Sequence, residues 1–363
     1  MSKSIKNCYD NKLTYINLYN AYYRICKNNR NKKYILKYEL DLETNLNNLL
    51  YKLKNNLYKP GKYKEFTIYE PKERLIKALP FEDRIVHQWY IEEFIKPYII
   101  PRFIKDSYSC IETKGLHKGV NQLQKYMRIM YNKNKDYYIL KCDIKKFFYN
   151  IDKNILFDIM KRYISDKKLL NLTKIIIFDN TGDISIPIGN YTSQYFANIY
   201  LHELDTYIKQ ELKIPFYERY MDDFVLLLNS KEESKIIMNK ISIFLKDNLH
   251  LELNSKSCYF HNKYGVNFLG YKIFNNYILL RKTSKIKMKK KVKKWNKEYE
   301  NNTLDKQEVL LSLNSWFGHI KHCDSYRLKK EILNSLNFNY NTLLFDIRYE
   351  KKEEEKQRDS NLV

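Results

Sequence analysis

The chain has 363 residues, of which 66 are Lys or Arg and 42 are Asp or Glu, so its formal net charge is +24. Hydrophobic residues make up 44% and aromatic residues 15%, which supports a buried core and excludes a mainly disordered chain. Eight glycines and seven prolines exclude collagen-like and low-complexity classes. The charge favours an anionic partner, with nucleic acid ahead of an anionic membrane surface.

Six cysteines are spread along the chain with no C-x-x-C pair, so the sequence predicts neither a disulfide framework nor a zinc ribbon. This cysteine usage fits a reducing cytoplasm. Residues 1–12 lack the apolar core of a secretion signal, and no stretch reaches the ~20 uncharged apolar residues needed to span a bilayer. We therefore expect a cytoplasmic protein with no membrane partner.

The first part of the chain predicts helices followed by a pair of strands. Residues 1–58 carry aliphatic and tyrosine residues at helical spacing, and the Pro60-Gly61 pair stops the last helix. From Tyr63 to Leu79, short alternating apolar runs predict two strands that carry the basic residues Lys72 and Arg74. A helix is predicted next, over 82–94, with an apolar face formed by Ile85, Trp89 and Ile91.

An apolar strand predicted over 137–143 ends on a carboxylate, Asp143. Strand alternation places Asp143 on the same face as Ile139 and Lys141. An apolar strand that ends in Asp is a common position for a metal ligand. Two further helices are predicted, over 152–170 and over 192–212, the second after the turn Pro187-Ile188-Gly189.

A hairpin with an acidic tip is predicted later in the chain. Two β-prone runs, 217–220 and 224–228, are separated by Met221-Asp222-Asp223, the length of a tight loop. By itself, this tip suits an ordinary turn, in which Asp side chains bond the turn backbone. Two adjacent carboxylates between apolar strands repel each other, however, unless a cation lies between them. A second pair of short strands is predicted around 259–264 and 268–273.

From Lys285 onward the pattern is helical and very basic. Met288, Val292, Trp295 and Tyr299 form one apolar stripe, and lysines surround it. These lysines fit either an ordinary solvated face or the binding of a nucleic-acid backbone. The residues that we assign to backbone binding are Lys289, Lys290 and Lys293.

The order of these motifs resembles the reverse transcriptases. Tyr220-Met221-Asp222-Asp223 is similar to their Y-x-D-D box, and the run from Asp143 to Phe148 is similar to the preceding metal-site motif of the same palm. The order and context make the resemblance specific, and it covers roughly residues 60–275. The matching segments are, in order, Lys72 and Arg74, Asp143, Gly189 to Gln194, Asp222-Asp223, Leu253 to Lys256, and Phe268 to Tyr271.

The resemblance implies an α+β fold of the right-hand polymerase type, with fingers, a palm built on an antiparallel sheet, and a helical thumb. We expect the parts in this order: an N-terminal helical segment over 1–58, fingers over 59–135, a palm with part of the fingers over 136–275, a helical thumb over 276–347 and a flexible tail over 348–363.

The implied reaction is RNA-directed DNA synthesis by two-metal nucleotidyl transfer. Hard oxygen ligands suit Mg²⁺, and two such ions can activate a 3′-hydroxyl and stabilise the leaving pyrophosphate. Mn²⁺ is an alternative ion. The resemblance implies that the catalytic aspartates are Asp143, Asp222 and Asp223, that these and Ile144 form the metal site, and that Lys256 donates a proton to pyrophosphate. A solvated loop lysine is the simpler interpretation of Lys256.

The resemblance also implies the residues that contact the nucleotide. Lys72 and Arg74 grip the triphosphate, as a point charge and as a fork respectively. Phe148 excludes a ribose 2′-hydroxyl and so favours deoxynucleotides. Ile188 lacks the amide that contacts the incoming nucleotide in relatives, so discrimination between base pairs is expected to be loose. Gly189 and Gln194 complete this set.

Within the family, the chain resembles the reverse transcriptases of diversity-generating retroelements. It has Pro187-Ile188-Gly189 where most relatives have Pro-Gln-Gly, and Ser193-Gln194 where they have Ser-Pro, and that subgroup shares both departures. This implies error-prone cDNA synthesis from a retroelement template RNA (mutagenic retrohoming) in a bacterial or phage-encoded system. The implied partners are template RNA, the RNA/DNA hybrid, deoxynucleotides and an accessory variability protein.

Two other functions stay open on the sequence alone. One is the reverse transcriptase of a retron or a phage-defence system, which shares versions of these motifs. The other is a catalytically idle RNA-binding protein that kept the fold, which the three intact aspartates disfavour. His319, His322 and Cys323 suit ordinary helix residues better than zinc ligands, because no second ligand pair is nearby in the sequence.

Overall fold

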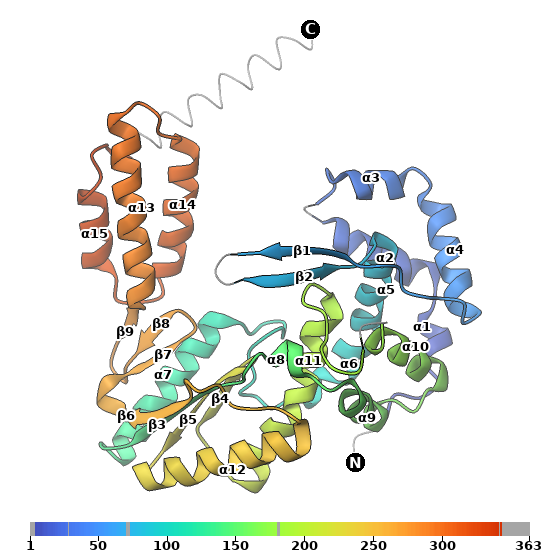
Figure 1. The fold of residues 1–363 in the computed structure, drawn as a ribbon, viewed down its shortest axis with the longest axis horizontal. Coiled ribbons are helices and arrows are strands. Elements are labelled where there is room, and N and C mark those ends of the chain that lie inside the picture. The colour runs from blue at the N-terminus through green and yellow to red at the C-terminus, as the bar shows by residue number, and fades with distance from the viewer. Residues whose placement is uncertain (1–3, 28, 70–72, 180–181, 341, 343–363) are drawn as a thin grey trace. The chain divides into compact units, whose positions relative to one another are not determined.

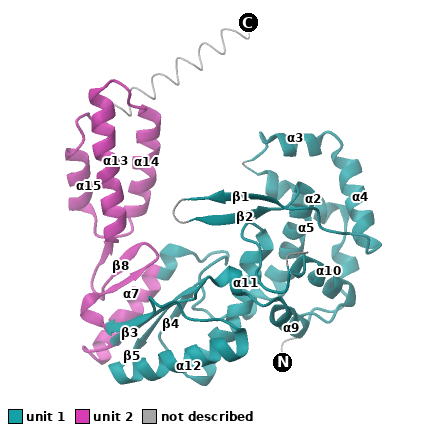
Figure 2. Cartoon of the chain, in the orientation of Figure 1, with its two compact units in different colours: residues 1–119, 138–260 teal, residues 120–137, 261–363 magenta. Residues whose placement is uncertain are grey.

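The computed structural model describes residues 4–27, 29–69, 73–179, 182–340 and 342. The chain divides into two compact units (Figure 2), each built from two separate stretches of sequence. Unit 1 contains Met1–Gly119 and Tyr138–Phe260, and unit 2 contains Val120–Tyr137 and His261–Val363. Lys72 and the tail expected over 348–363 lie outside the described residues. In the part that is described, no helix combines the length and the apolar character needed to cross a bilayer.

Among the described residues of the N-terminal region, for which the sequence predicts helices, the structure has four helices. Their bounds are α1 Tyr9–Lys12, α2 Tyr15–Cys26, α3 Lys33–Glu39 and α4 Leu42–Lys54. Thr14 caps α2, because its Oγ1 accepts a hydrogen bond of 3.2 Å from the backbone N–H of Asn17. Leu18 of α2 and Leu46 of α4 are fully buried in the core of unit 1.

The predicted strand pair follows as β1 Lys64–Ile68 and β2 Arg74–Ala78, which pair antiparallel (Figure 1). The predicted helix over 82–94 is present, and its residues Ile85, Trp89 and Ile91 are fully buried. It consists of an α-helix that continues into a π-helical turn and two short helical segments: α5 Phe81–Tyr90, η1 Ile91–Ile95, α6 Lys96–Tyr98 and η2 Ile100–Arg102.

A four-stranded sheet has the order β4-β5-β3-β6, with bounds β3 Tyr138–Asp143, β4 Tyr217–Tyr220, β5 Asp223–Leu228 and β6 Cys258–His261. The hairpin prediction is confirmed, since β4 pairs antiparallel with β5 and Met221 and Asp222 form the two-residue turn. Leu140 and Phe224 face the core of unit 1. The alternate residues, which include Asp143 and Asp223, project from the opposite face.

Two long helices pack beside this sheet. α11 Tyr191–Thr206 continues into η3 Tyr207–Glu211, and α12 Lys231–Leu249 packs against β3, β5 and α11 (Figure 1). α11 is buried along most of its length, and Phe196 and Tyr200 contribute its largest apolar side chains to the core. Because α11 starts at Tyr191, with only its N-cap residue Asn190 after Gly189, its packing fixes the position of the Ile188-Gly189 turn.

The single helix predicted over 152–170 is wrong, because the structure has two helices there. After α8 Phe147–Asn150, the chain forms α9 Lys153–Tyr163 and α10 Lys167–Ile177. Ile164 is extended and its backbone bridges to Ile5, and Asp166 caps α10 by accepting from the backbone of Lys168 and Leu169 at 3.1 Å each. Apolar spacing continues through the break, so the periodicity does not reveal it.

Unit 2 contains a three-stranded antiparallel sheet and a helical bundle. The elements are α7 Leu116–Lys133, whose first turn belongs to unit 1, η4 Asn262–Tyr264, β7 Val266–Phe268, β8 Tyr271–Ile273, β9 Ile278–Leu280, α13 Lys282–Glu300, α14 Lys306–Ile320 and α15 Tyr326–Asn334. Short strands are present in both of the stretches predicted, 259–264 and 268–273, but they belong to different sheets: β6 pairs beside β3, and β8 pairs with β7 and β9. By joining β3, β6 satisfies backbone groups that an unpaired strand edge would leave open.

The apolar stripe predicted in the basic helix forms the core of the bundle. Met288, Val292 and Trp295 of α13 are buried together with Val309 and Leu313 of α14. The stripe ends before its last predicted member. Tyr299 is 46% exposed, because the chain turns soon afterwards, and its ring stands 5.3 Å from that of Phe338.

Candidate active site

Asp143 and Asp223 lie opposite each other at one end of the four-stranded sheet. Asp143 is the last residue of β3 and Asp223 is the first of β5, and the register pairs their Cα atoms. Tyr220, the last residue of β4, pairs with Asp223 on its other side. Directly paired residues of antiparallel strands project from the same face, so these side chains are neighbours although they come from distant parts of the sequence.

Asp222 lies in the turn that joins β4 to β5. Burial raises the pKa of Asp222 to about 6, and the negative charges of Asp143 and Asp223 add to the shift. The Arg74 guanidinium acts in the opposite direction and favours the charged form. Two further carboxylates and one of the predicted triphosphate ligands therefore lie within electrostatic range of Asp222.

Neighbouring side chains hold the aspartates. Asn254 binds Asp143 twice, because its Nδ2 donates to Asp143 Oδ2 at 2.9 Å and its backbone N–H donates to the Asp143 carbonyl at 2.7 Å. The backbone N–H of Asp143 donates to Ser257 Oγ at 3.2 Å. Lys141, which is also on β3, forms an ion pair through its Nζ with Asp223 Oδ1 of β5. The end of β3 is thus fixed by the loop before β6.

Within the described residues, no group of three or more His, Cys, Asp or Glu side chains is arranged so that it could hold a metal ion. The donor chemistry nevertheless fits a hard divalent cation, because Mg²⁺ prefers carboxylate oxygens, and burial together with the negative charges of Asp143 and Asp223 raises the pKa of Asp222. Ile144, which the resemblance also places at the metal, is buried, and its backbone bridges to Leu253.

The Ile188-Gly189 turn is docked on β2, the strand that begins with Arg74. The backbone N–H of Lys77 donates to the Ile188 carbonyl at 2.9 Å. Gly189 has φ +129°, and a Cβ at this position would lie 2.6 Å from the Lys77 carbonyl oxygen. Only glycine permits this approach without displacing β2. The turn and the basic strand are therefore in direct backbone contact.

The remaining predicted site residues are two nucleotide-binding residues, on α8 and α11, and the predicted proton donor Lys256, in the loop before β6. Phe148 of α8 is half-buried, and its carbonyl accepts from the backbone N–H of Ile186 at 3.0 Å. Gln194 is exposed on α11, and its Oε1 accepts from Cys110 Sγ at 3.3 Å. Lys256 is exposed and follows Asn254 by two residues, with its backbone N–H donating to Asn254 Oδ1 at 3.1 Å.

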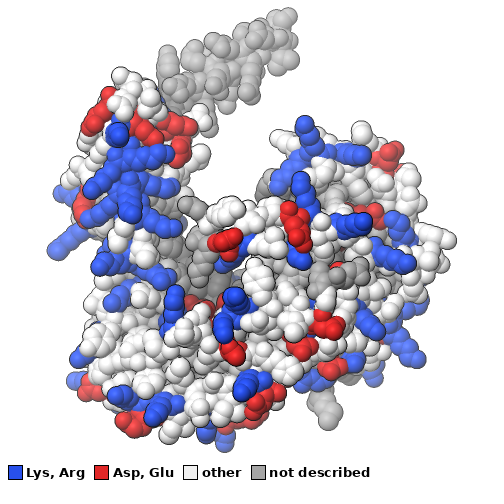
Figure 3. All heavy atoms as spheres, in the orientation of Figure 1, with Lys and Arg blue, Asp and Glu red and all other residues white. Residues whose placement is uncertain are grey.

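The three lysines predicted to bind a nucleic-acid backbone belong to unit 2. All three lie on α13, where Figure 3 shows Lys and Arg side chains gathered. Lys290 and Lys293 are exposed, and Lys289 forms an ion pair with Glu331 of α15. The basic surface is thus carried by one helix face, in a different unit from the aspartates.

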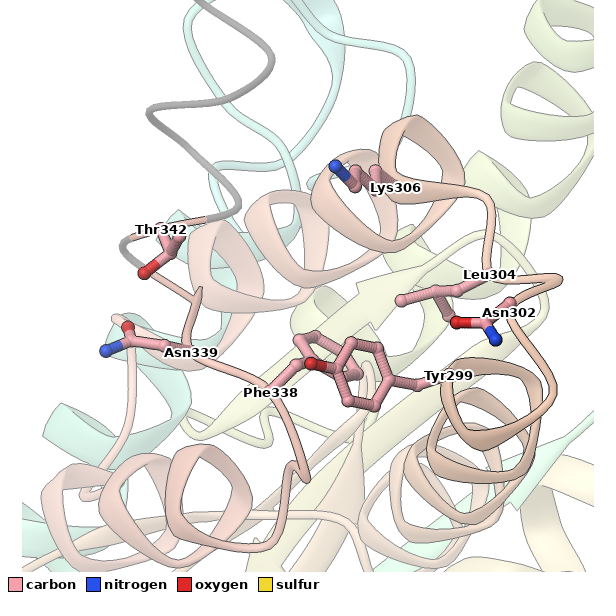
Figure 4. Close-up of a pocket in the computed structure, with 7 residues that line it drawn as sticks. All are labelled: Tyr299, Asn302, Leu304, Lys306, Phe338, Asn339 and Thr342. Atoms are coloured by element: carbon pink, nitrogen blue, oxygen red, sulfur yellow. The ribbon is translucent and has the colours of Figure 1, made fainter.

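A pocket of about 440 Å³ also lies in unit 2 (Figure 4). It contains none of the predicted site residues. Its lining combines two aromatic rings with amide, hydroxyl and ammonium groups: Tyr299, Asn302, Leu304, Lys306, Phe338, Asn339 and Thr342.

Three residues at the site had no assigned role in the sequence, namely Lys141, Asn254 and Arg219. The sequence could have indicated two of them. Strand alternation places Lys141 on the face of Asp143, and Asn254 is two residues before Lys256. The sequence could not have indicated Arg219, because its importance depends on contacts between β4 and α11 that no local pattern encodes.

The antiparallel sheet with acidic residues at one end, flanked by helices and followed by a helical bundle, is the fold of a right-hand polymerase. The reverse transcriptase (RNA-dependent DNA polymerase) family matches residues 59–273, well over half of the chain. This chain belongs to that family.

The chain is similar to proteins of several reverse transcriptase systems. It is 31% identical over 140 residues to the retron Ec73 reverse transcriptase of Escherichia coli, covering 35% of this chain and 44% of that protein. It is 22% identical over 329 residues to the group II intron-encoded protein LtrA of Lactococcus lactis subsp. cremoris, covering 69% of this chain and 52% of that protein. The chain spans about half the length of these relatives.

Among solved structures, the apo telomerase of Candida tropicalis truncated from its C-terminal domain is similar, with a TM-score of 0.45 and 14% identity. The match covers 61% of this chain and 55% of that chain.

Proposed function

We propose that this protein is an RNA-directed DNA polymerase that copies a retroelement template RNA into error-prone cDNA. The observation that carries the proposal is the convergence of Asp143, Asp222 and Asp223 at one end of the sheet, with Arg74 in electrostatic range. Carboxylates grouped beside a cationic side chain suit the transfer of a nucleotide, whose triphosphate needs divalent cations and a positive partner.

In this proposal the three aspartates hold the metal ions, and Arg74 and Lys72 bind the triphosphate. Bound there, Mg²⁺ would supply the charge that activates the primer 3′-hydroxyl and stabilises the leaving pyrophosphate. Asn254 holds the Asp143 carboxylate in place, and Lys256 donates a proton to the departing pyrophosphate. Phe148 excludes the ribose 2′-hydroxyl, and Ile188 and Gly189 flank the base pair that forms.

The error-prone, retroelement assignment is supported by Ile188, an apolar residue where most relatives carry an amide. Without that amide, the site loses one hydrogen-bond test of the incoming base. The partners in this proposal are template RNA, the RNA/DNA hybrid and an accessory variability protein, in the cytoplasm of a bacterium or a phage-infected host.

A second candidate is the reverse transcriptase of a retron or a phage-defence system. The observation that favours it is the 31% identity to a retron reverse transcriptase. The two candidates share the polymerase chemistry and differ in the template RNA and in fidelity.

The polymerase chemistry is tested by Asp222→Asn in the purified full-length chain. Because the substitution removes one of three converging carboxylates but keeps the volume, we expect cDNA synthesis on a primed RNA to fall below detection. Binding of the same RNA, measured by filter retention, should stay within about three-fold. Asp247→Asn, on the exposed face of α12, is the matched control and should keep full activity.

Undiminished synthesis by the Asp222→Asn protein would refute the catalytic role of the aspartates. RNA binding without synthesis by the natural sequence under all conditions would instead favour an idle RNA-binding protein.

The error-prone assignment is tested by Ile188→Gln, which restores the amide. We expect fewer misincorporations at template adenines, measured by sequencing cDNA made on one defined RNA. An error spectrum that is accurate at adenines in the natural sequence, and unchanged by the substitution, would favour the retron or phage-defence candidate.

A further inference from the structure

Arg219 of β4 is a completely buried arginine with a completely buried acidic partner. Its Nε donates to Asp205 Oδ1 at 2.7 Å and its Nη2 donates to Asp205 Oδ2 at 2.6 Å. Both side chains have no exposed surface. The hydroxyl of Tyr217 also donates to Asp205 Oδ1, at 2.6 Å. This two-point contact fixes the plane of the guanidinium relative to α11, because a bidentate pair allows little rotation.

The remaining nitrogen of Arg219 reaches the turn that carries Asp222. Nη1 donates to Asn198 Oδ1 at 2.9 Å and to the Met221 carbonyl oxygen at 3.1 Å. Asn198 is itself held, since its Nδ2 donates to the Ser109 carbonyl at 2.9 Å. The guanidinium therefore connects a buried helix to one carbonyl of the β4–β5 turn.

That carbonyl belongs to a residue in an unfavourable backbone conformation. Met221 has φ +55°, in the left-handed region that side chains other than Gly, Asn and Asp seldom adopt. The peptide between Met221 and Asp222 is planar, so a bond that holds the Met221 carbonyl also sets the direction of the Asp222 N–H. The Arg219 contact thus opposes relaxation of the turn.

We propose that Arg219 is a positioning residue for catalysis, which holds the Met221-Asp222 turn in the conformation that presents the Asp222 carboxylate. This inference rests on the proposed polymerase function. Arg219 itself lies on the core-facing side of the sheet and touches no reacting atom; it acts through the Met221 carbonyl. A purely structural role would require only the ion pair with Asp205, and the contact with Met221 would then be incidental.

The test removes the contact without leaving a buried charge. In the double variant R219M/D205L, both partners are replaced by apolar residues of similar size, which buried pairs often tolerate. We expect a folded protein by circular dichroism and thermal unfolding, kcat reduced on the order of 10²-fold, and KM for deoxynucleotide within about three-fold. R162M/E203L is the matched control, because it removes a partly exposed Arg–Glu pair to the same helix, and it should keep its kcat.

A rescue experiment separates positioning from folding. Met221→Asn favours the left-handed conformation, so it should raise kcat at least about three-fold in the R219M/D205L background. In the natural background it should give no such gain. Equal effects of Met221→Asn in both backgrounds, or a kcat of R219M/D205L equal to that of the natural sequence, would overturn the proposal.

If the double variant does not fold, Arg219→Lys provides a second test of the same proposal. A lysine can still neutralise Asp205, but one ammonium cannot match the carboxylate fork and the Met221 carbonyl together. The same loss of kcat and the same rescue by Met221→Asn are expected. If the natural sequence makes no DNA, the proposed function has failed; if it does and these variants equal it, only the role of Arg219 has failed.

Discussion

His87 is a histidine that the fold keeps neutral. It lies on α5 with 2% of its surface exposed, and its Nδ1 is 2.9 Å from Thr192 Oγ1 at the start of α11. Burial lowers the pKa of His87 to about 4. The side chain is thus neutral in the folded protein above about pH 4, where it joins two core helices.

This pKa predicts a pH-dependent stability. Between about pH 6.5 and pH 4 the unfolded chain binds a proton at His87 that the folded chain does not, so the free energy of unfolding falls as the pH falls. The loss from this group is about 3 kcal/mol over that range. Urea unfolding of His87→Gln between pH 4 and 7 should show a shallower pH dependence than the natural sequence.

His250→Gln serves as the control, since the side chain of His250 is 61% exposed and pairs with Asp152 at the surface. A His87→Gln protein with the same pH dependence as the natural sequence would contradict the burial argument.

At the level of single residues, the sequence identifies acidic candidates better than it identifies their supports. Asp143 and Asp222 stand out because one ends a strongly apolar strand and the other lies in a short turn before a second apolar strand. The Arg219–Asp205 pair does not, because its two members lie on a strand and a helix whose relative rotation is set by packing alone. A buried ion pair between distant elements has no local pattern.

Asp166 shows how one side chain can define two helices. Besides capping α10, its Oδ2 accepts from the backbone N–H groups of Cys8 at 2.8 Å and Tyr9 at 3.0 Å. These bonds tie the first helix of the chain to the start of α10. They also lower the pKa of Asp166, against the opposing effect of burial.

Asp166→Ala is therefore expected to lower the free energy of unfolding by more than the loss of an ordinary helix cap does. The substitution removes bonds to four backbone donors and should lower the free energy of unfolding by about 3 kcal/mol. Ser230→Ala, which removes the cap of α12 in the same unit, should cost about 1 kcal/mol. Thermal and urea unfolding of both variants measures the difference, and equal costs would contradict the tie to the first helix.

Element types follow from the sequence where apolar spacing changes abruptly. The strand pair β1–β2, the apolar strand β3 and the β4–β5 hairpin are predicted correctly, because turn residues and alternation agree. The break between α9 and α10 and the partner of β6 are not, since both depend on a distant backbone: Ile5 in the first case and β3 in the second.

In the whole molecule, the two compact units do not follow the order of the chain, because each contains two separate stretches of sequence. Unit 2 combines residues 120–137, from the middle of the sequence, with the residues from 261 onward. A division into consecutive segments, as expected from the resemblance, is a different description of the chain. Contacts that join α7 to the turn between β8 and β9 contribute to this arrangement, for example Arg128 Nε donating to the Asn275 carbonyl at 2.8 Å.

The net charge of +24 predicts salt-dependent nucleic-acid binding, and α13 concentrates part of it. If Lys290 and Lys293 each contact a phosphate, replacing both by Gln should lower the slope of log affinity against log salt by about 1.5. Fluorescence anisotropy of a labelled RNA/DNA hybrid at several salt concentrations measures this slope.

The control replaces Lys161 and Lys168, which pair with Asp158 and Asp10 in unit 1. If the slope of log affinity against log salt is unchanged in the α13 variant, or changes equally in the control, the basic face of α13 does not bind the nucleic-acid backbone and is an ordinary solvated surface.

The hydrogen bond from the Lys77 backbone N–H to the Ile188 carbonyl couples the position of β2, which begins with Arg74, to that of the turn before α11. If the proposed function holds, with Ile188 at the new base pair and Arg74 on the triphosphate, a wrongly shaped base pair that displaces Ile188 would also displace β2 and move the guanidinium away from the phosphates. In that proposal, the rigidity of the contact between β2 and the turn would set the tolerance for mispairs.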